Sequence, residues 1–206
     1  GAADNQLGAA VSAAGDVNND GFDDLLIGEP NFSNGQTREG RLILYDGAAA
    51  PATTPAWSYE SDQGNAFLGR AVAAAGDINN DGFADVLGGA NSYDNVQANE
   101  GRAYVFHGSA AGLPATPTTA LEINIASVQF GFDLSGNFDV NADGFDDIIV
   151  GAPFLDDGQI FEGGAYVHYG SATGVSTTPD WEVQSDQASA QLGPDVSGLA
   201  DVNDDD

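Results

Sequence analysis

A short acidic segment recurs along this chain at nearly constant spacing. Complete copies begin at Asp16, Asp77 and Asp139, a fourth begins at Asp201, and successive starts are 61, 62 and 62 residues apart. A fixed period of this size makes the repeat the unit of architecture, so we expect an array of similar modules. The expected repeats span approximately residues 5–62, 63–125, 126–187 and, incompletely, 188–206.

The remainder of each repeat is typical of β-structure. Small residues precede the acidic segment, a short apolar run follows it, and two later segments alternate apolar and polar residues. The expected strands are residues 9–14, 25–28, 41–45 and 57–60 in the first repeat, 71–75, 86–89, 103–107 and 121–125 in the second, and 148–151, 165–169 and 181–184 in the third. No helical periodicity competes with this pattern, so an all-β fold is predicted.

Four strands per repeat favour the four-stranded antiparallel blades of a β-propeller. The first strand is rich in alanine, a weak strand former, and such small side chains suit a crowded position near the axis of a closed ring. A linear stack of small β-modules or a β-solenoid is the alternative. On the propeller interpretation, residues 1–206 form a single partial propeller.

Each acidic segment has the spacing of a cation-binding loop. Oxygen-bearing side chains at positions 1, 3, 5 and 9, a backbone carbonyl at position 7 and a glycine at position 6 suit calcium better than magnesium, which demands tighter geometry. The predicted ligands are Asp16, Asn18, Asp20, Phe22 and Asp24; Asp77, Asn79, Asp81, Phe83 and Asp85; and Asp139, Asn141, Asp143, Phe145 and Asp147. An incomplete fourth site would use Asp201, Asn203 and Asp205, with Asp206 where the glycine is needed.

Two other interpretations of the loop fit the sequence less well. An EF-hand needs a glutamate at position 12 between two helices, whereas Ile27, Gly88 and Val150 stand there with strand-like flanks. A single copy could be a solvated Asx turn, but three copies in register favour a metal site. At position 8, Asp23 and Asp146 are expected to face solvent or to support the ligands.

The charge of the chain excludes several classes of partner. Thirty-two acidic residues against 4 basic ones give a formal net charge of −28, which disfavours nucleic acid and anionic membrane surfaces. The chain has no cysteine and no apolar run long enough to span a membrane. Arg41 and Arg102 follow Glu-Gly at the same repeat position, which favours structural ion pairs.

The ordered motifs resemble the FG-GAP repeat of integrin α-subunit propellers and related bacterial proteins. The resemblance rests on Phe130-Gly131 and its Leu-Gly variants, the acidic loops, and Gly151-Ala152-Pro153 with its variant Gly28-Glu29-Pro30. It implies that the calcium loop is a hairpin between the first and second strands of each blade. It also implies adhesion or ligand binding through other loops and partner subunits.

A secreted or cell-surface binding module is therefore expected, with calcium (Ca2+) in a structural role and a protein or glycan as ligand. No catalytic constellation is apparent, because His107 and His168 are out of register between repeats and no G-x-S-x-G motif occurs. The alternatives are the repeat region of a secreted hydrolase or lyase, or a structural cell-surface component. The absence of methionine and the start at Gly1 favour a segment of a longer protein, so the ring would be closed by the rest of that chain or by self-association.

Overall fold

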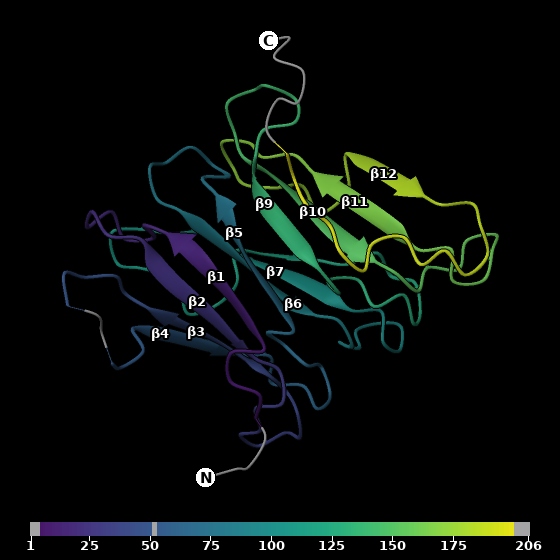
Figure 1. Cartoon of the computed structure of the whole chain (residues 1–206), viewed down its shortest axis with the longest axis horizontal. Helices are drawn as coiled ribbons and strands as arrows, with labels where there is room; N and C mark the ends of the chain where they lie inside the picture. The colour runs from purple at the N-terminus through teal and green to yellow at the C-terminus, as the bar shows by residue number, and fades with distance from the viewer. Residues whose placement is uncertain (1–4, 51–52, 200–206) are drawn as a thin grey trace.

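The computed structural model describes residues 5–50 and 53–199, and it contains three antiparallel four-stranded sheets (Figure 1). The first sheet contains β1 (Ala10–Gly15), β2 (Asp24–Glu29), β3 (Arg41–Tyr45) and β4 (Trp57–Glu60); the second contains β5 (Ala71–Gly76), β6 (Asp85–Ala90), β7 (Arg102–Phe106) and β8 (Thr119–Leu121); and the third contains β9 (Leu134–Phe138), β10 (Asp147–Ala152), β11 (Gly164–His168) and β12 (Trp181–Gln184). Each strand pairs with its neighbours in chain order, as expected for propeller blades. The described residues contain no helix, and hence none that could cross a membrane.

The first strands of the sheets lie side by side, with β5 between β1 and β9 (Figure 1). Their small side chains permit this approach: a Cβ added at Gly136 would lie 2.7 Å from the Cα of Ala75. Larger apolar side chains fill the space farther out between sheets, where Phe106 and Leu42 belong to one cluster and Phe130 and Ile148 to another. The crowding predicted for the first strand is therefore observed.

Consecutive sheets meet through pairs of glycines. We call Gly28, Gly89 and Gly151 the strand-end glycines, and Gly8, Gly69, Gly131 and Gly193 the opening glycines. A Cβ added to the strand-end glycines would lie 1.9, 2.2 and 2.0 Å from the carbonyl oxygens of Gly69, Gly131 and Gly193, in that order. The next repeat therefore packs directly on the backbone of the preceding one. Parallel bridges from Gly40 to Leu68, Gly101 to Phe130 and Gly163 to Leu192 extend this contact.

The fourth strand of the second repeat differs from its prediction. We expected residues 121–125, but β8 covers Thr119–Leu121, where Thr119 pairs with Val105 and Leu121 with Ala103. Alternation of Leu121, Ile123 and Ile125 suggested a strand two residues too late, and Asn124 has a φ of +54°, which leaves the extended conformation. β7 and β11 each begin and end one residue earlier than predicted.

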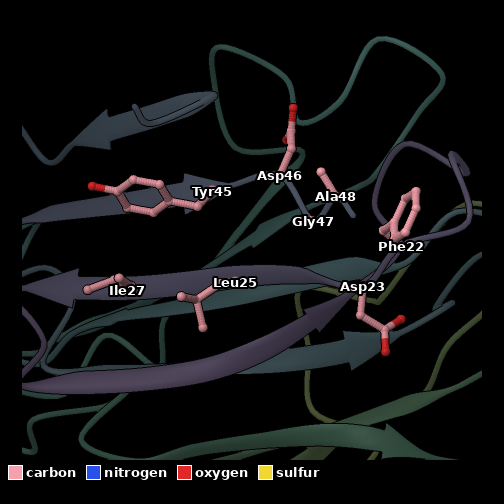
Figure 2. Close-up of a pocket in the computed structure, with 8 residues that line it drawn as sticks. All are labelled: Phe22, Asp23, Leu25, Ile27, Tyr45, Asp46, Gly47 and Ala48. Atoms are coloured by element: carbon pink, nitrogen blue, oxygen red, sulfur yellow. The ribbon is translucent and has the colours of Figure 1, made fainter. Parts of the chain in front are cut away.

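The outward face of the first sheet is open, unlike the equivalent faces of the other two. Leu25 is 40% exposed, whereas Val86 and Ile148, which follow the last loop aspartate in the same way, are fully buried. Leu25, Ile27 and Tyr45 line a pocket of about 410 Å³ on this face (Figure 2). In the second and third sheets the preceding sheet covers this position, whereas no sheet precedes the first one within the described residues.

Candidate metal centre

The acidic loops join the first and second strands of the sheets, all at the same end. Within the first loop, Asp16 accepts hydrogen bonds from the backbone N–H groups of Asp20 (3.0 Å) and Gly21 (2.7 Å). Asn18 also accepts from the Asp20 N–H, and Asp20 accepts from the Phe22 N–H. The second and third loops repeat all four bonds. The side-chain oxygens at positions 1, 3 and 5 therefore face the interior of a tightly wound loop.

The aspartate at position 9 is buried and fastens the loop to the sheet. One carboxylate oxygen of Asp85 accepts from the Ile78 N–H at 3.0 Å, and the other accepts from the Gly108 N–H at 2.9 Å, beyond β7. Asp24 bonds Val17 and Gly47 in the same way, and Asp147 bonds Val140 and Gly170. This carboxylate holds together both connections at that end of each sheet.

Burial, with a smaller contribution from neighbouring negative charge, raises the pKa values of these carboxylates. The pKa of Asp85 is raised to about 7, with burial as the largest cause; two backbone hydrogen bonds oppose the increase, and the charges of Asp77 and Asp81 add to it. Burial and like charges also raise the pKa values of Asp24 and Asp147. A divalent cation in the loop would offset this repulsion, and that is the physical ground on which the donor set fits calcium.

The loops also contact one another across sheets. Asn19 donates to the carbonyl of Gly82 in the second loop, and Asn80 donates in the same way to Gly144 in the third. At position 8, Asp146 accepts a 2.7 Å hydrogen bond from the N–H of Asp77, whereas Asp23 is exposed. Asp146 therefore supports a predicted ligand of the preceding repeat.

The structure places the three sets of predicted ligands in three equivalent loops, but their carboxylates do not converge closely. Across the described ranges, the only group of three acidic or histidine side chains with ligand atoms within 4.8 Å of one another lies elsewhere, at Glu39, Glu60 and Asp62. The backbone bonds of the position 9 aspartates draw their carboxylates toward the sheet. Calcium binding by the loops stays a prediction, and the incomplete fourth site at Asp201, Asn203 and Asp205 lies outside the described residues.

One set of buried residues was missed by the sequence analysis. Glu39, Glu100 and Glu162 are fully buried, and each uses Oε1 to accept backbone N–H groups of the connection that precedes it. The repeated Glu-Gly dipeptide was the available signal. The ion pairs predicted for Arg41 and Arg102 are present, with Glu29 and Glu122 as their partners, both at 2.5 Å.

The two histidines occupy different environments. His107 lies beside the second loop, with its Nδ1 3.3 Å from Nδ2 of Asn79, and His168 lies in β11 with Nδ1 2.8 Å from the carbonyl oxygen of Ser176. Burial lowers the pKa of both. They do not form a common site.

The raised pKa of Asp85 predicts a pH-dependent stability in calcium-free solution. The folded-state pKa of about 7 exceeds the unfolded value, so between these two pKa values Asp85 is protonated in the folded chain and ionised in the unfolded chain. The folded chain therefore loses stability as pH rises through this range. Between pH 5 and pH 8, we expect the free energy of unfolding of the unaltered chain to fall by on the order of 2 kcal/mol relative to that of Asp85→Asn. The amide of the variant mimics the protonated acid and does not titrate. Urea unfolding measures this difference, in which the effects of the histidines cancel. Asp23→Asn is the matched control, and a difference independent of pH would contradict the prediction.

Comparison with known proteins identifies three copies of the FG-GAP repeat, at residues 7–45, 68–106 and 130–168, which together make up more than half of the chain. The chain is 32% identical to integrin alpha-5 of Xenopus laevis over 82% of its own length and 17% of that protein. It is 32% identical to integrin alpha-7 of Homo sapiens (68% of this chain, 12% of that protein) and 36% identical to integrin alpha pat-2 of Caenorhabditis elegans (70% and 13%). The chain thus spans 12 to 17% of the length of these relatives.

Proposed function

Because the chain belongs to the FG-GAP repeat family, we propose that it is part of an extracellular, integrin-like propeller that binds a protein or glycan and holds calcium as a structural ion. The observation that carries this proposal is the repetition of one acidic loop in three sheets of a chain similar to integrin α-subunits. Nothing in the donor set requires a catalytic role for the cation.

Calcium would be held by the side-chain oxygens at loop positions 1, 3, 5 and 9 and the carbonyl at position 7. It supplies positive charge where three carboxylates of each loop lie in one short hairpin. The chain's own part is to wind the loop by its backbone N–H groups and to fasten it through Asp24, Asp85 or Asp147. The bound ion would then stabilise the sheet and would have no part in ligand recognition.

Recognition would use the opposite end of the sheets, where the connections between second and third strands differ between repeats. The residue two before the buried glutamate is Thr37, Ala98 or Ile160, and Ile160 is 66% exposed. Val96 in the second repeat is 72% exposed. Exposed apolar side chains on variable loops suit contact with a protein or glycan surface.

Ring closure would come from further blades of the parent protein. Leu25 and Ile27 lie on the open face of the first sheet (Figure 2). In the next two repeats the counterparts of Leu25, Val86 and Ile148, are fully buried. Self-association of this chain is the second way to cover it, and it would appear as a dimer or larger species in solution.

A binding assay tests the proposed function. The immobilised chain is offered a glycan array and a panel of extracellular-matrix proteins, in millimolar calcium and in chelator. We expect saturable binding of at least one probe in calcium, reduced about tenfold by Val96→Ser with Ile160→Ser, since buried apolar contacts of this size contribute about 1–3 kcal/mol. Val140→Thr is the control, because Val140 is exposed in the third acidic loop, at the other end of the sheet. We expect this variant to bind as the unaltered chain does. Retention of no probe, or cleavage of an offered glycan, would contradict the proposal, and cleavage would favour a hydrolase.

A further inference from the structure

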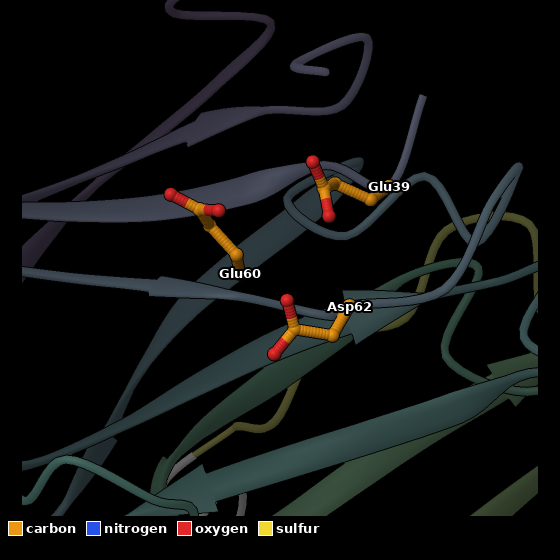
Figure 3. Close-up of side chains that lie close together, drawn as sticks. All are labelled: Glu39, Glu60 and Asp62. Atoms are coloured by element: carbon orange, nitrogen blue, oxygen red, sulfur yellow. The ribbon is translucent and has the colours of Figure 1, made fainter. Parts of the chain in front are cut away.

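We propose a second type of cation site, formed by Glu39, Glu60 and Asp62 in the first repeat alone. It lies at the end of the sheet opposite the acidic loops. One carboxylate oxygen from each residue lies within 4.8 Å of the others, and the three carboxylates face a common space (Figure 3). Oxygens at this spacing can share a calcium ion, whose ligands lie about 2.3–2.6 Å from its centre. This site is independent of the loops and of the function proposed for them.

An unsatisfied buried oxygen points to the ligand. Glu39 is fully buried and its Oε1 accepts from the Asn34 N–H, but its Oε2 has no hydrogen-bond partner among the described residues. A buried carboxylate oxygen without a partner is costly. Glu60 is half-buried and Asp62 is exposed, so a cation could enter from solvent and keep some of its water.

The ion pairs of the first two repeats explain why the first repeat leaves these acids without a basic partner. In the first sheet Arg41 lies in register between Glu29 on β2 and Glu60 on β4, and it binds Glu29 at 2.5 Å. In the second sheet Ala90 replaces Glu29, and the equivalent Arg102 turns to Glu122, the counterpart of Glu60. Glu29 therefore draws the arginine away and leaves Glu60 available to a cation.

The other two repeats keep the buried glutamate but lack the complete set of acids. Asn124 stands in place of Asp62 in the second repeat, and Gln184 stands in place of Glu60 in the third. The Gln184 amide instead donates to Asp157 at 3.2 Å. Glu100 and Glu162 have the same unpartnered Oε2 within the described part of the chain. The buried glutamate is therefore common to the three repeats, and only the first repeat combines it with an acid at both of the other positions, since the second keeps Glu122 alone and the third keeps Asp186 alone.

The test uses calcium as the probe and substitutions taken from the sister repeats. Amide NMR signals of Asn34 and Asp62 are followed during a calcium titration, while signals of the acidic loops, at the other end of the strands, report their own binding separately. We expect a saturable shift at the cluster, with affinity at least about tenfold weaker in Glu60→Gln and in Asp62→Asn. Glu29→Ala retains all three ligands but frees Arg41 to pair with Glu60. We expect it to weaken calcium binding at the cluster as much as Glu60→Gln does.

The control is Asp186→Asn, which changes the third-repeat counterpart of Asp62 and should leave the titration at Asn34 and Asp62 unaltered. Preserved loop signals establish that each variant is folded. The proposal is overturned if the cluster signals show no saturable change with calcium. It is also overturned if Glu60→Gln and Glu29→Ala bind calcium there as tightly as the unaltered chain.

Discussion

Calcium is expected to raise the melting temperature of the chain by at least about 15 °C over its value in chelator. For a domain of this size, each added kcal/mol of unfolding free energy raises the melting temperature by about 2–4 °C. Each occupied loop adds about 2.7 kcal/mol when free calcium is a hundredfold above its dissociation constant, so three loops together add roughly 8 kcal/mol. The expected cause is that the cation would bind only the folded loop, where carboxylates already repel one another around Asp85. Differential scanning calorimetry across a calcium titration measures the shift.

Control variants distinguish the loss of a predicted calcium ligand from the loss of a nearby negative charge. Asp20→Asn, Asp81→Asn and Asp143→Asn together remove the position 5 carboxylate from each loop and should abolish most of the calcium-dependent shift. Asp23→Asn removes an exposed acid just outside the ligand set and should preserve it. Equal melting temperatures in calcium and chelator for the unaltered chain would refute the structural role of the ion.

Gly89→Ala is expected to destabilise the chain by about 3 kcal/mol or more, because the added methyl group overpacks the contact between two sheets. The new Cβ would lie 2.2 Å from the carbonyl oxygen of Gly131, a backbone atom that cannot rotate away. The second and third sheets would have to separate, and the bond from the Gly69 N–H to the Gly89 carbonyl would be strained. Urea unfolding at constant calcium measures the loss.

Gly112→Ala provides the comparison for Gly89→Ala. Gly112 has a φ of +80°, and a Cβ added there meets no atom within 4 Å, so its substitution costs only the backbone strain of about 1 kcal/mol. If both variants lose the same amount of stability, the glycine contact does not hold the sheets together.

The repeats and most strands could be predicted because their signals are local. Short branched runs such as residues 148–151 have no competing pattern, and the glycine at position 6 of each loop marks the turn. The fourth strand of the second repeat was misplaced because its pairing is decided by β7. The period of 62 residues places Thr119, not the more apolar Leu121, at the position of Trp57.

The acidic cluster and the choice of arginine partner could not be predicted in the same way. Glu39 lies in the connection before β3, Glu60 is the last residue of β4, and Asp62 follows that strand. Only the folded register brings their oxygens together. Whether Arg41 binds Glu29 or Glu60 depends on a residue in the neighbouring strand. Likewise the hydrogen bond that the Asp77 N–H donates to the Asp146 carboxylate joins consecutive sheets, so no local sequence pattern predicts it.

The glycine contact between sheets gives the array a head and a tail. Each repeat presents a strand-end glycine on one side and an opening glycine on the other, so successive units must join heterologously, always in one direction. Such a contact repeated at a constant rotation closes into a ring or continues as a helix, depending on the angle alone. The number of blades that closes a ring thus depends on the angle between neighbouring sheets, to which the close packing at Gly28, Gly89 and Gly151 contributes.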